Sequence, residues 1–199
     1  MASPKAAKVS LRERFRNESA QEILAAAEQV FTQQGLLGAS MAMIAEQAGV
    51  AVGTLYNRFK DRDALLQELI AQRRAELLEE LERVSEQLAS LGLRERLTGV
   101  VQALLLHCEQ HRPFLRLVLS SEWGHGQSKE LMLRALRERL QAVLGSGPEL
   151  REDPDGALPL LLISLVRGTL ERDRYGLPVL EPALAARQVV ELFLNGAGR

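Results

Sequence analysis

The residues with the clearest capacity for chemistry lie in one short stretch, and their chemistry suits hydrogen bonding to nucleic acid. Tyr56, Asn57, Arg58 and Lys60 fall close together in the chain. A tyrosine hydroxyl and a lysine ammonium group suit phosphate oxygens. An asparagine amide can pair with the edge of adenine, and an arginine guanidinium group with guanine or with phosphate. The stretch therefore predicts a surface that contacts both the backbone and the bases of DNA.

Two short helices joined by a tight turn would position these side chains. Ser40 is suited to cap a helix over about 41–48, and Gly49 suits the turn that follows because glycine adopts a positive φ without steric cost. Helices that cross closely need a small residue in the first, here Ala45, and an apolar residue returning from the second, here Leu55. This spacing predicts a helix-turn-helix.

The start of the second helix adds further candidate contacts. Its small residues would let the DNA backbone approach closely, and its first N–H groups would point toward phosphate. Phe59, in contrast, is expected to turn inward and hold this helix in place. The predicted DNA-contacting residues are Ser40, Ala51, Val52, Gly53, Thr54, Tyr56, Asn57, Arg58, Lys60 and Arg62.

A basic segment precedes this unit. Residues 1–16 carry Lys5, Lys8 and three arginines against a single glutamate, whereas the whole chain has a formal net charge of −1. A basic terminal segment on an acidic protein commonly binds the phosphates of nucleic acid, although many such segments are only solvated tails. The alternative for residues 40–62 is a solvated helical hairpin, and the ordered combination of cap, turn and crossing residues argues against it.

Residues 39–70, ASMAMIAEQAGVAVGTLYNRFKDRDALLQELI, resemble the DNA-binding signature of the TetR/AcrR family of bacterial transcriptional regulators. The similarity covers roughly residues 17–70, and the rest of the chain agrees with the family only in length and helical pattern. The resemblance implies a dimeric repressor with about nine helices per subunit. In that family the last two helices pack against those of the partner, and the middle helices enclose an inducer pocket.

The resemblance also carries DNA contacts onto particular positions. It implies contacts, mainly to phosphates, for Ser40, Thr54, Tyr56 and Lys60. Base-reading positions vary within the family, and here they correspond to Ala51, Val52, Asn57 and Arg58. Asn57 and Arg58 stand where the family often has a Tyr-His or similar pair, so the operator sequence stays open.

A pair of histidines forms a second candidate site. His107 and His111, in the sequence HCEQH, would share one face of a helix at the spacing of a two-histidine metal clip. A third ligand is evident only if Glu122 or His125 folds back, so we expect no metal and no cofactor. The alternative functions are a metal-dependent helical enzyme that uses this pair, and an all-α interaction module without a DNA role. We expect a regulator and not an enzyme.

A pocket for an unknown small-molecule effector is expected in the second half of the chain. Arg167 lies in an apolar helix, and a buried arginine needs a carboxylate partner, in its own subunit or across a dimer, or an anionic ligand. Pairing with a carboxylate is favoured. Trp123 would form a pocket wall or gate, or simply part of the core. The predicted pocket residues are His107, His111, Phe114, Trp123 and Arg167.

The periodicity of apolar residues predicts an all-α fold, because strand-type alternation is absent. The predicted helices cover about 17–34, 41–48, 52–59 and 62–89, then a helix from residue 93, a short one over FLRLVLSSE, and 128–144, 157–175 and 181–195. They group into a basic flexible arm (1–16), a helix-turn-helix DNA-binding domain (17–66) and a ligand-binding and dimerisation domain (67–199).

The last two predicted helices are apolar on more than one face, so they must be covered on several sides. In a chain of this size a second copy is the natural cover, and we expect a homodimer. The predicted interface residues are Ile163, Leu170, Val189 and Phe193. The alternative is that helices of the same subunit cover them.

Composition limits the number of domains, the cellular compartment and the possibility of membrane contact. The chain has 199 residues, of which 46% are hydrophobic and 26% charged, enough for one compact domain or two small ones. Its single cysteine, Cys108, excludes an internal disulfide and fits a reducing compartment. No apolar run reaches the ~20 residues of a membrane helix, and the N-terminal residues lack the apolar region of a secretory signal. We expect a cytoplasmic protein without membrane contact.

Overall fold

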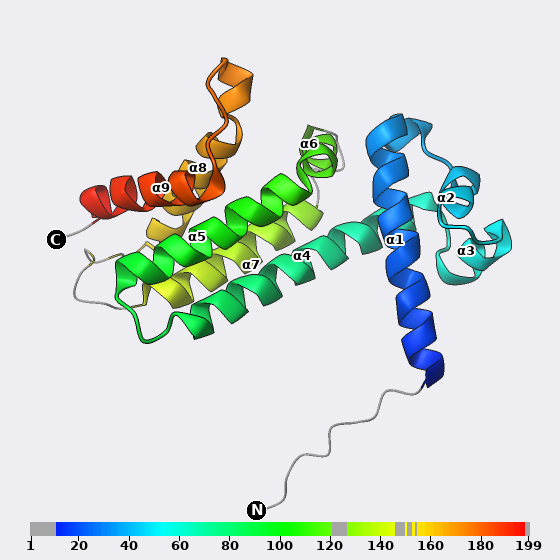
Figure 1. The fold of residues 1–199 in the computed structure, drawn as a ribbon, viewed down its shortest axis with the longest axis horizontal. Helices are drawn as coiled ribbons and strands as arrows, with labels where there is room; N and C mark the ends of the chain where they lie inside the picture. The colour runs from blue at the N-terminus through cyan, green and yellow to red at the C-terminus, as the bar shows by residue number, and fades with distance from the viewer. Residues whose placement is uncertain (1–10, 121–126, 146–149, 151–152, 154, 198–199) are drawn as a thin grey trace, which may run out of the picture. The chain divides into compact units, whose positions relative to one another are not determined.

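The computed structural model describes residues 11–120, 127–145, 150, 153 and 155–197. Over these residues the chain forms α-helices and one short 3-10 helix (Figure 1). The elements are α1 (Leu11–Gly38), α2 (Met41–Gln47), α3 (Val52–Arg58), α4 (Arg62–Gln87), α5 (Leu93–Gln110), α6 (Arg112–Ser120), α7 (Gln127–Leu144), α8 (Leu158–Leu170), the 3-10 helix η2 (Arg172–Tyr175) and α9 (Pro182–Ala197). The predicted all-α fold is confirmed.

The chain divides into two compact units. The first covers residues 1–71 and the second residues 72–199. The division falls five residues later than the expected boundary at 66, because α4 begins in the first unit and ends in the second. Within the described residues, no helix is long and apolar enough to cross a membrane.

The first unit packs α1, α2 and α3 around a small apolar core. Ile23 and Phe31 of α1, Ile44 of α2 and Leu55 of α3 are almost fully buried in it. Burying each such side chain contributes about 1.5–3 kcal/mol. This core holds the two short helices, which are too short to be stable alone.

Helix α1 differs from its prediction at both ends. It begins at Leu11, so its first turns overlap the predicted arm of residues 1–16, of which residues 1–10 lie outside the described part. Gly35 has a φ of 75° and interrupts the helix close to its predicted end. The residues that follow, 36–38, are again helical.

The second unit has its own core. Helix α5 packs against α7, α8 and α9, and α8 packs against α9. Leu81 of α4, Leu97 of α5, Leu140 of α7 and Leu162 of α8 are completely buried in this core. The apolar stripe of the second half of α4 therefore belongs to the second unit.

The eighth predicted helix, 157–175, is split. α8 ends at Leu170, and η2 covers Arg172–Tyr175 up to Gly176, whose φ is 69°. Contacts from outside the helix hold this turn, because Arg112 and Arg116 of α6 both bind the carboxylate of Asp173. Helical periodicity alone does not reveal such a tertiary contact.

Candidate functional site

Side-chain caps fix the ends of the helices around the predicted DNA-reading unit. The Ser40 hydroxyl oxygen accepts a hydrogen bond from the backbone N–H of Met43 at 3.3 Å. The Asp61 carboxylate accepts one from the N–H of Ala64 at 2.7 Å. The predicted N-cap at Ser40 is confirmed, and each of the two caps satisfies an N–H group that the helix itself leaves without a partner.

The close crossing of α2 and α3 also has the predicted form. Ala45 is 1% exposed and Leu55 is completely buried. Gly49 has a φ of 67°, and the N–H of the next residue, Val50, donates to the carbonyl oxygen of Ala45 at 3.0 Å. A small residue, a left-handed turn and a returning apolar residue thus lock the two helices together.

This crossing leaves the predicted DNA contacts exposed. Leu55 and Phe59 are buried, whereas Tyr56 is 54% exposed. The guanidinium group of Arg58 lies 5.7 Å from the centre of the Phe59 ring, which steadies it at the surface. The other exposed members of the predicted set are Ser40, Ala51, Val52, Gly53, Thr54, Asn57 and Lys60.

Arg62 has a structural position that the sequence did not reveal. Its guanidinium group donates to the carbonyl oxygens of Leu37 at 3.3 Å and Ala39 at 3.4 Å, and it pairs with Asp63 at 3.2 Å. It therefore ties the residues at the end of α1 to the start of α4. Its predicted phosphate contact stays a prediction.

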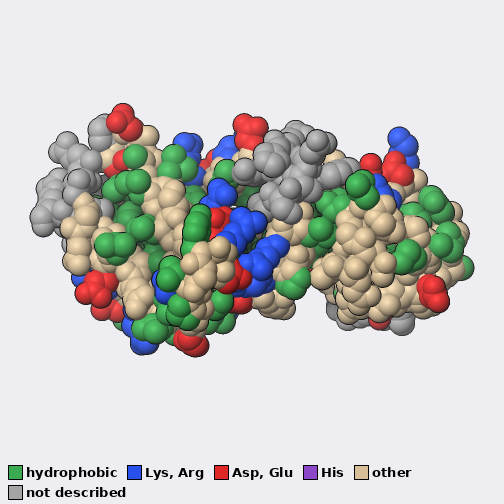
Figure 2. Space-filling view, turned by 90° about the horizontal axis from the view of Figure 1, so that it is seen from above, with side chains coloured by type: hydrophobic (Ala, Val, Ile, Leu, Met, Phe, Trp, Pro, Cys, Tyr) green, Lys and Arg blue, Asp and Glu red, His purple; other side chains and the backbone are tan. Residues whose placement is uncertain are grey.

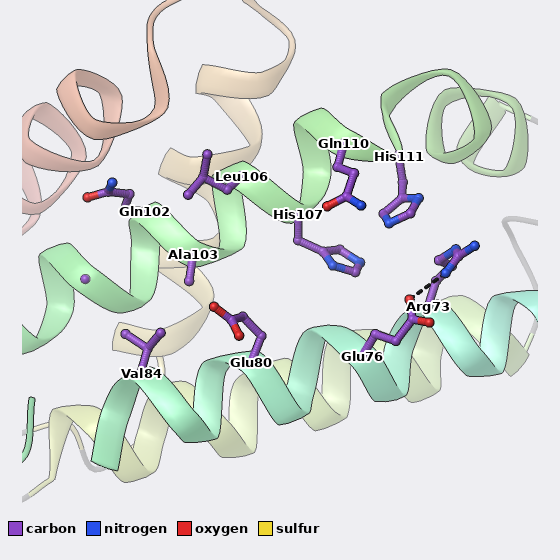
Figure 3. A pocket seen from close by; sticks show the side chains of 11 residues that line it. Arg73, Glu76, Glu80, Val84, Gln102, Ala103, Leu106, His107, Gln110 and His111 are labelled. Atoms are coloured by element: carbon purple, nitrogen blue, oxygen red, sulfur yellow. Dashed lines mark hydrogen bonds and ion pairs between the residues drawn. The ribbon is translucent and has the colours of Figure 1, made fainter. Parts of the chain in front are cut away.

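A pocket of about 540 Å³ lies in the second unit between α4 and α5 (Figure 3). It is lined by Arg73, Glu76, Glu80, Val84, Gly99, Gln102, Ala103, Leu106, His107, Gln110 and His111. All four α4 residues share one helix face, since their spacing of three or four residues matches the helical repeat. Both predicted histidines are among the lining residues.

The other predicted pocket residues lie elsewhere or outside the described part. Phe114 is only 1% exposed and does not line this pocket. The expectation that Arg167 is buried is wrong, because its side chain is 68% exposed and pairs with Glu171 in the next turn at 2.9 Å. Trp123 lies outside the described residues, as do Glu122 and His125.

The polar residues that α4 contributes were missed in the sequence. Arg73, Glu76 and Glu80, in the charged part of α4, turn toward α5 (Figure 3). Their spacing of three or four residues places them on one helix face, and this was the available signal in the sequence. The signal was ambiguous, because a helix face that contacts only solvent shows the same pattern of charges.

Arg73 and Glu76 form a compact ion pair at one end of the pocket. Their charged atoms are 2.6 Å apart, and Gln72 adds a hydrogen bond to the same carboxylate at 2.8 Å. Burial alone raises the pKa of Glu76, but the hydrogen bonds from Arg73 and Gln72 outweigh it, with help from the charges of Arg73 and His111. The net result is a lowered pKa, so Glu76 is ionised at neutral pH.

Glu80 is held in a different way. Arg83, one turn further along α4, binds both of its carboxylate oxygens, at 2.6 and 2.9 Å. These hydrogen bonds lower the pKa of Glu80 against a small opposing effect of burial, and the charges of Arg83 and His107 lower it further. Glu80 is therefore also ionised, but its partner is a side chain that is 53% exposed.

Within the described part of the chain, the histidine pair belongs to no group of side chains that could hold a metal ion. The ring centres of His107 and His111 are 4.9 Å apart and tilted by 52°. Among the described residues, no group of three or more His, Cys, Asp or Glu side chains has an arrangement that could hold a metal ion. Burial, with a contribution from Glu109, raises the pKa of the neighbouring Cys108 thiol to about 11, which keeps it protonated and unreactive.

Two predicted interface residues belong to the core of their own subunit. Val189 is 5% and Phe193 4% exposed, and both pack in the core of the second unit. Ile163 and Leu170 are half-buried against the same core. Val189 and Phe193 share the face of α9 that carries Ala185 and Ala186, and their place in a dimer interface stays a prediction.

The outer faces of α8 and α9 nevertheless carry exposed leucines. On α8 Leu160 is 46% and Leu161 55% exposed, and on α9 Leu184 is 40% and Leu192 62% exposed. Figure 2, which views the molecule from above, shows hydrophobic side chains at several points on the surface, next to a group of charged side chains. Exposed apolar side chains that gather on one surface are typical of interaction sites.

A protein-family comparison and one curated relative agree on the class of this chain. Residues 23–69 match the family described as bacterial regulatory proteins, tetR family. A 104-residue region, 51% of this chain, is 33% identical to TtgW of Pseudomonas putida, named an uncharacterized HTH-type transcriptional regulator, and covers 73% of that protein.

Solved structures share the fold over most of the chain. The regulator FadR from Bacillus subtilis in complex with stearoyl-CoA is 22% identical, with a TM-score of 0.73 over 88% of this chain and 98% of that one. SmeT, the repressor of the Stenotrophomonas maltophilia multidrug efflux pump SmeDEF, is 20% identical, with a TM-score of 0.72 over 90% of each chain. At these identities the similarity demonstrates a common fold.

Proposed function

Because the chain belongs to the TetR family of bacterial regulatory proteins, we propose that it is a dimeric repressor released from its DNA operator by a small molecule. The family consists of transcriptional regulators, so the protein is a DNA-binding regulator and not the metal-dependent enzyme considered as an alternative. The repressor role, the dimer and the response to an effector are the parts that we propose.

One observation carries the proposed response to an effector. The pocket has α4 as one wall, and the same helix begins in the unit that holds the predicted DNA-reading residues. A ligand in the pocket therefore contacts the element that joins the two units. Such a ligand can shift DNA affinity only if it binds the DNA-competent and DNA-incompetent states with different affinities.

The fold neighbours support a response to small molecules. The Bacillus subtilis neighbour is described in complex with stearoyl-CoA, and the Stenotrophomonas neighbour is described as a repressor. Both descriptions belong to those proteins. They make a pocket-bound effector and repression the natural proposal for a chain with the same fold.

The proposed dimer explains the exposed leucines of α8 and α9. A symmetric partner would present the same two helices, so each exposed leucine would be covered by its counterpart surface. In the dimer two reading units would enter successive major grooves of a near-palindromic site, about 34–36 Å apart.

The test is DNA binding by the full chain to the DNA upstream of its own gene. We expect a shifted complex in fluorescence anisotropy, with an affinity that falls steeply between 50 and 200 mM salt, by about 10³-fold or more if six or more phosphates are contacted. Charge reversal of Arg58 and Lys60 together is expected to abolish the complex. Absence of salt-sensitive binding to any duplex would exclude the proposal.

A further inference from the structure

We propose that the pocket between α4 and α5 takes an amphiphilic small molecule with a protonated nitrogen, whose charge is held by Glu80. The inference rests on the proposed function, in that this ligand would be the effector. It goes further by assigning the charge of the ligand and the residue that recognises it.

The two ends of the pocket differ in polarity. Val84 of α4 and Ala103 of α5 lie toward one end, where the polar lining residue is the uncharged Gln102. Arg73, Glu76 and the two histidines form the other end (Figure 3). Glu80 lies between these ends, with its carboxylate turned toward α5. A ligand with an apolar body and one polar head matches this gradient.

The charges of the wall favour a cation. Arg73, Glu76 and Glu80 line the pocket, so its arginine and glutamate side chains carry a formal charge of −1. Glu76 neutralises Arg73 through their 2.6 Å contact. The other negative charge belongs to Glu80, whose partner Arg83 does not line the pocket.

Glu80 can exchange its present partner for a ligand, whereas Arg73 cannot. Arg83 pairs with Glu80 from the exposed side of the same helix, and exposed pairs of this kind contribute little stability. The Arg73 side chain is only 12% exposed, and pulling it away from Glu76 would leave a partly buried carboxylate without its counter-charge. An ammonium group can therefore take the place of Arg83 at low cost.

The same argument disfavours an anionic ligand. A carboxylate in the pocket would need Arg73, the one Lys or Arg side chain among the described lining residues, and would have to compete with Glu76 for it. It would also lie close to the negative charge of Glu80. Like charges at such distances repel strongly where water is partly excluded.

The test uses three probes with one carbon skeleton and different charges. 4-Phenylbutylamine, 4-phenylbutanol and 4-phenylbutyrate are titrated into the full chain at pH 7.5 by isothermal calorimetry. We expect the amine to bind at least about tenfold more tightly than the carboxylate, with the alcohol between them, as charge-assisted hydrogen bonds require. Equal affinities, tighter binding of the carboxylate, or no binding of the amine would overturn the proposal.

Variants of α4 locate the recognised charge. Glu80→Gln is expected to weaken amine binding about tenfold and to leave the alcohol unchanged. Arg83→Ala is expected to strengthen amine binding about two- to threefold, because it removes the competing cation. Glu79→Gln removes the neighbouring carboxylate, which is exposed and does not line the pocket, and is the matched control. Loss of amine affinity in the control alone would overturn the assignment.

DNA release provides an independent readout. The amine is expected to lower the affinity of the full chain for its operator, and Glu80→Gln to remove this effect while leaving DNA binding without the amine intact. A protein that binds DNA but not the amine would refute this inference and keep the proposed function. A protein that binds the amine but never DNA would refute the proposed function and keep the assignment of the ligand charge to Glu80.

Discussion

Single residues of this protein often serve the fold and a candidate site together. Ser40 caps α2 while its exposed position suits a phosphate contact, and Glu76 lines the pocket while it neutralises Arg73. The chemistry of such residues is visible in the sequence. Their partners are visible only in the structure, because Arg73 and Glu76 are also a common pattern of a solvated helix.

Replacing Glu76 by Gln is expected to lower stability in a pH-dependent manner. The pKa of Glu76 is lowered from its ordinary value of 4.5, so its stabilising effect is complete above that pH and disappears as the pH falls through the lower folded value. Urea unfolding at pH 7 should show a deficit for the variant, and this deficit should shrink below pH 4.5. A deficit of the same size at every pH would contradict the ion-pair account.

Two substitutions on α3 should distinguish contacts to the DNA phosphates, which position the protein, from contacts to the base edges, which determine sequence preference. Tyr56→Phe removes a hydroxyl group that we assign to a phosphate, so it should weaken binding to all duplexes by about 1 kcal/mol. Asn57→Ala should instead relax the preference for the operator over altered sites, by about 1–3 kcal/mol if the amide reads one base. Anisotropy with operator and scrambled duplexes distinguishes the two. Equal effects of both substitutions on both duplexes would reject the assignment.

Among the elements, the turn between α2 and α3 depends most on one residue. Gly49 has a φ of 67° and no atom within 4 Å of the place where a Cβ would stand, so an added methyl group would be strained but would not clash. Gly49→Ala should therefore cost about 1–2 kcal/mol, the penalty of a left-handed conformation for an L-residue. The measurement is the shift in the urea midpoint of the first unit.

Gly53 offers the matched control for this substitution. It also has open space around its Cβ position, but it lies inside α3 with an ordinary φ. Gly53→Ala should raise stability by about 0.5–1 kcal/mol, since alanine favours the helix. If both variants were destabilised equally, the turn would not depend on the left-handed conformation.

At the scale of elements the sequence predicted nearly all helices, and its errors have physical causes. The caps Ser40 and Asp61 and the turn at Gly49 are local signals, so the boundaries of α2, α3 and α4 were predicted within about two residues. The early end of α8 depends on Asp173, which side chains of α6 bind from a distance in the sequence. The pocket was recognised from α5 alone, because apolar spacing does not tell which charged face of α4 turns inward.

For the whole molecule, the exposed leucines of α8 and α9 predict how the chain assembles. Leu161→Glu combined with Leu192→Glu is expected to convert the proposed dimer to a monomer. Each substitution acts twice in a symmetric interface, and each buried leucine contributes about 1.5–3 kcal/mol. Sedimentation equilibrium measures the mass, and circular dichroism checks that the variant is folded.

The control for this prediction is a leucine outside α8 and α9. Leu91, between α4 and α5, is 47% exposed, against 55% for Leu161 and 62% for Leu192. Leu91→Glu should leave the mass unchanged. A wild-type chain that is monomeric at micromolar concentration would contradict the assembly itself.

The unbroken course of α4 has a consequence for how such regulators diversify. The last predicted DNA contact is Arg62 and the first pocket residue is Arg73, so the ten residues between them belong to neither set. A splice there would exchange the operator preference of one protein for that of another and keep the ligand preference. The splice must conserve the residue count, because one inserted residue turns all that follows by about 100° and advances it by about 1.5 Å. Recombination in this segment would thus be tolerated when segments of equal length are exchanged, but not when residues are inserted or deleted.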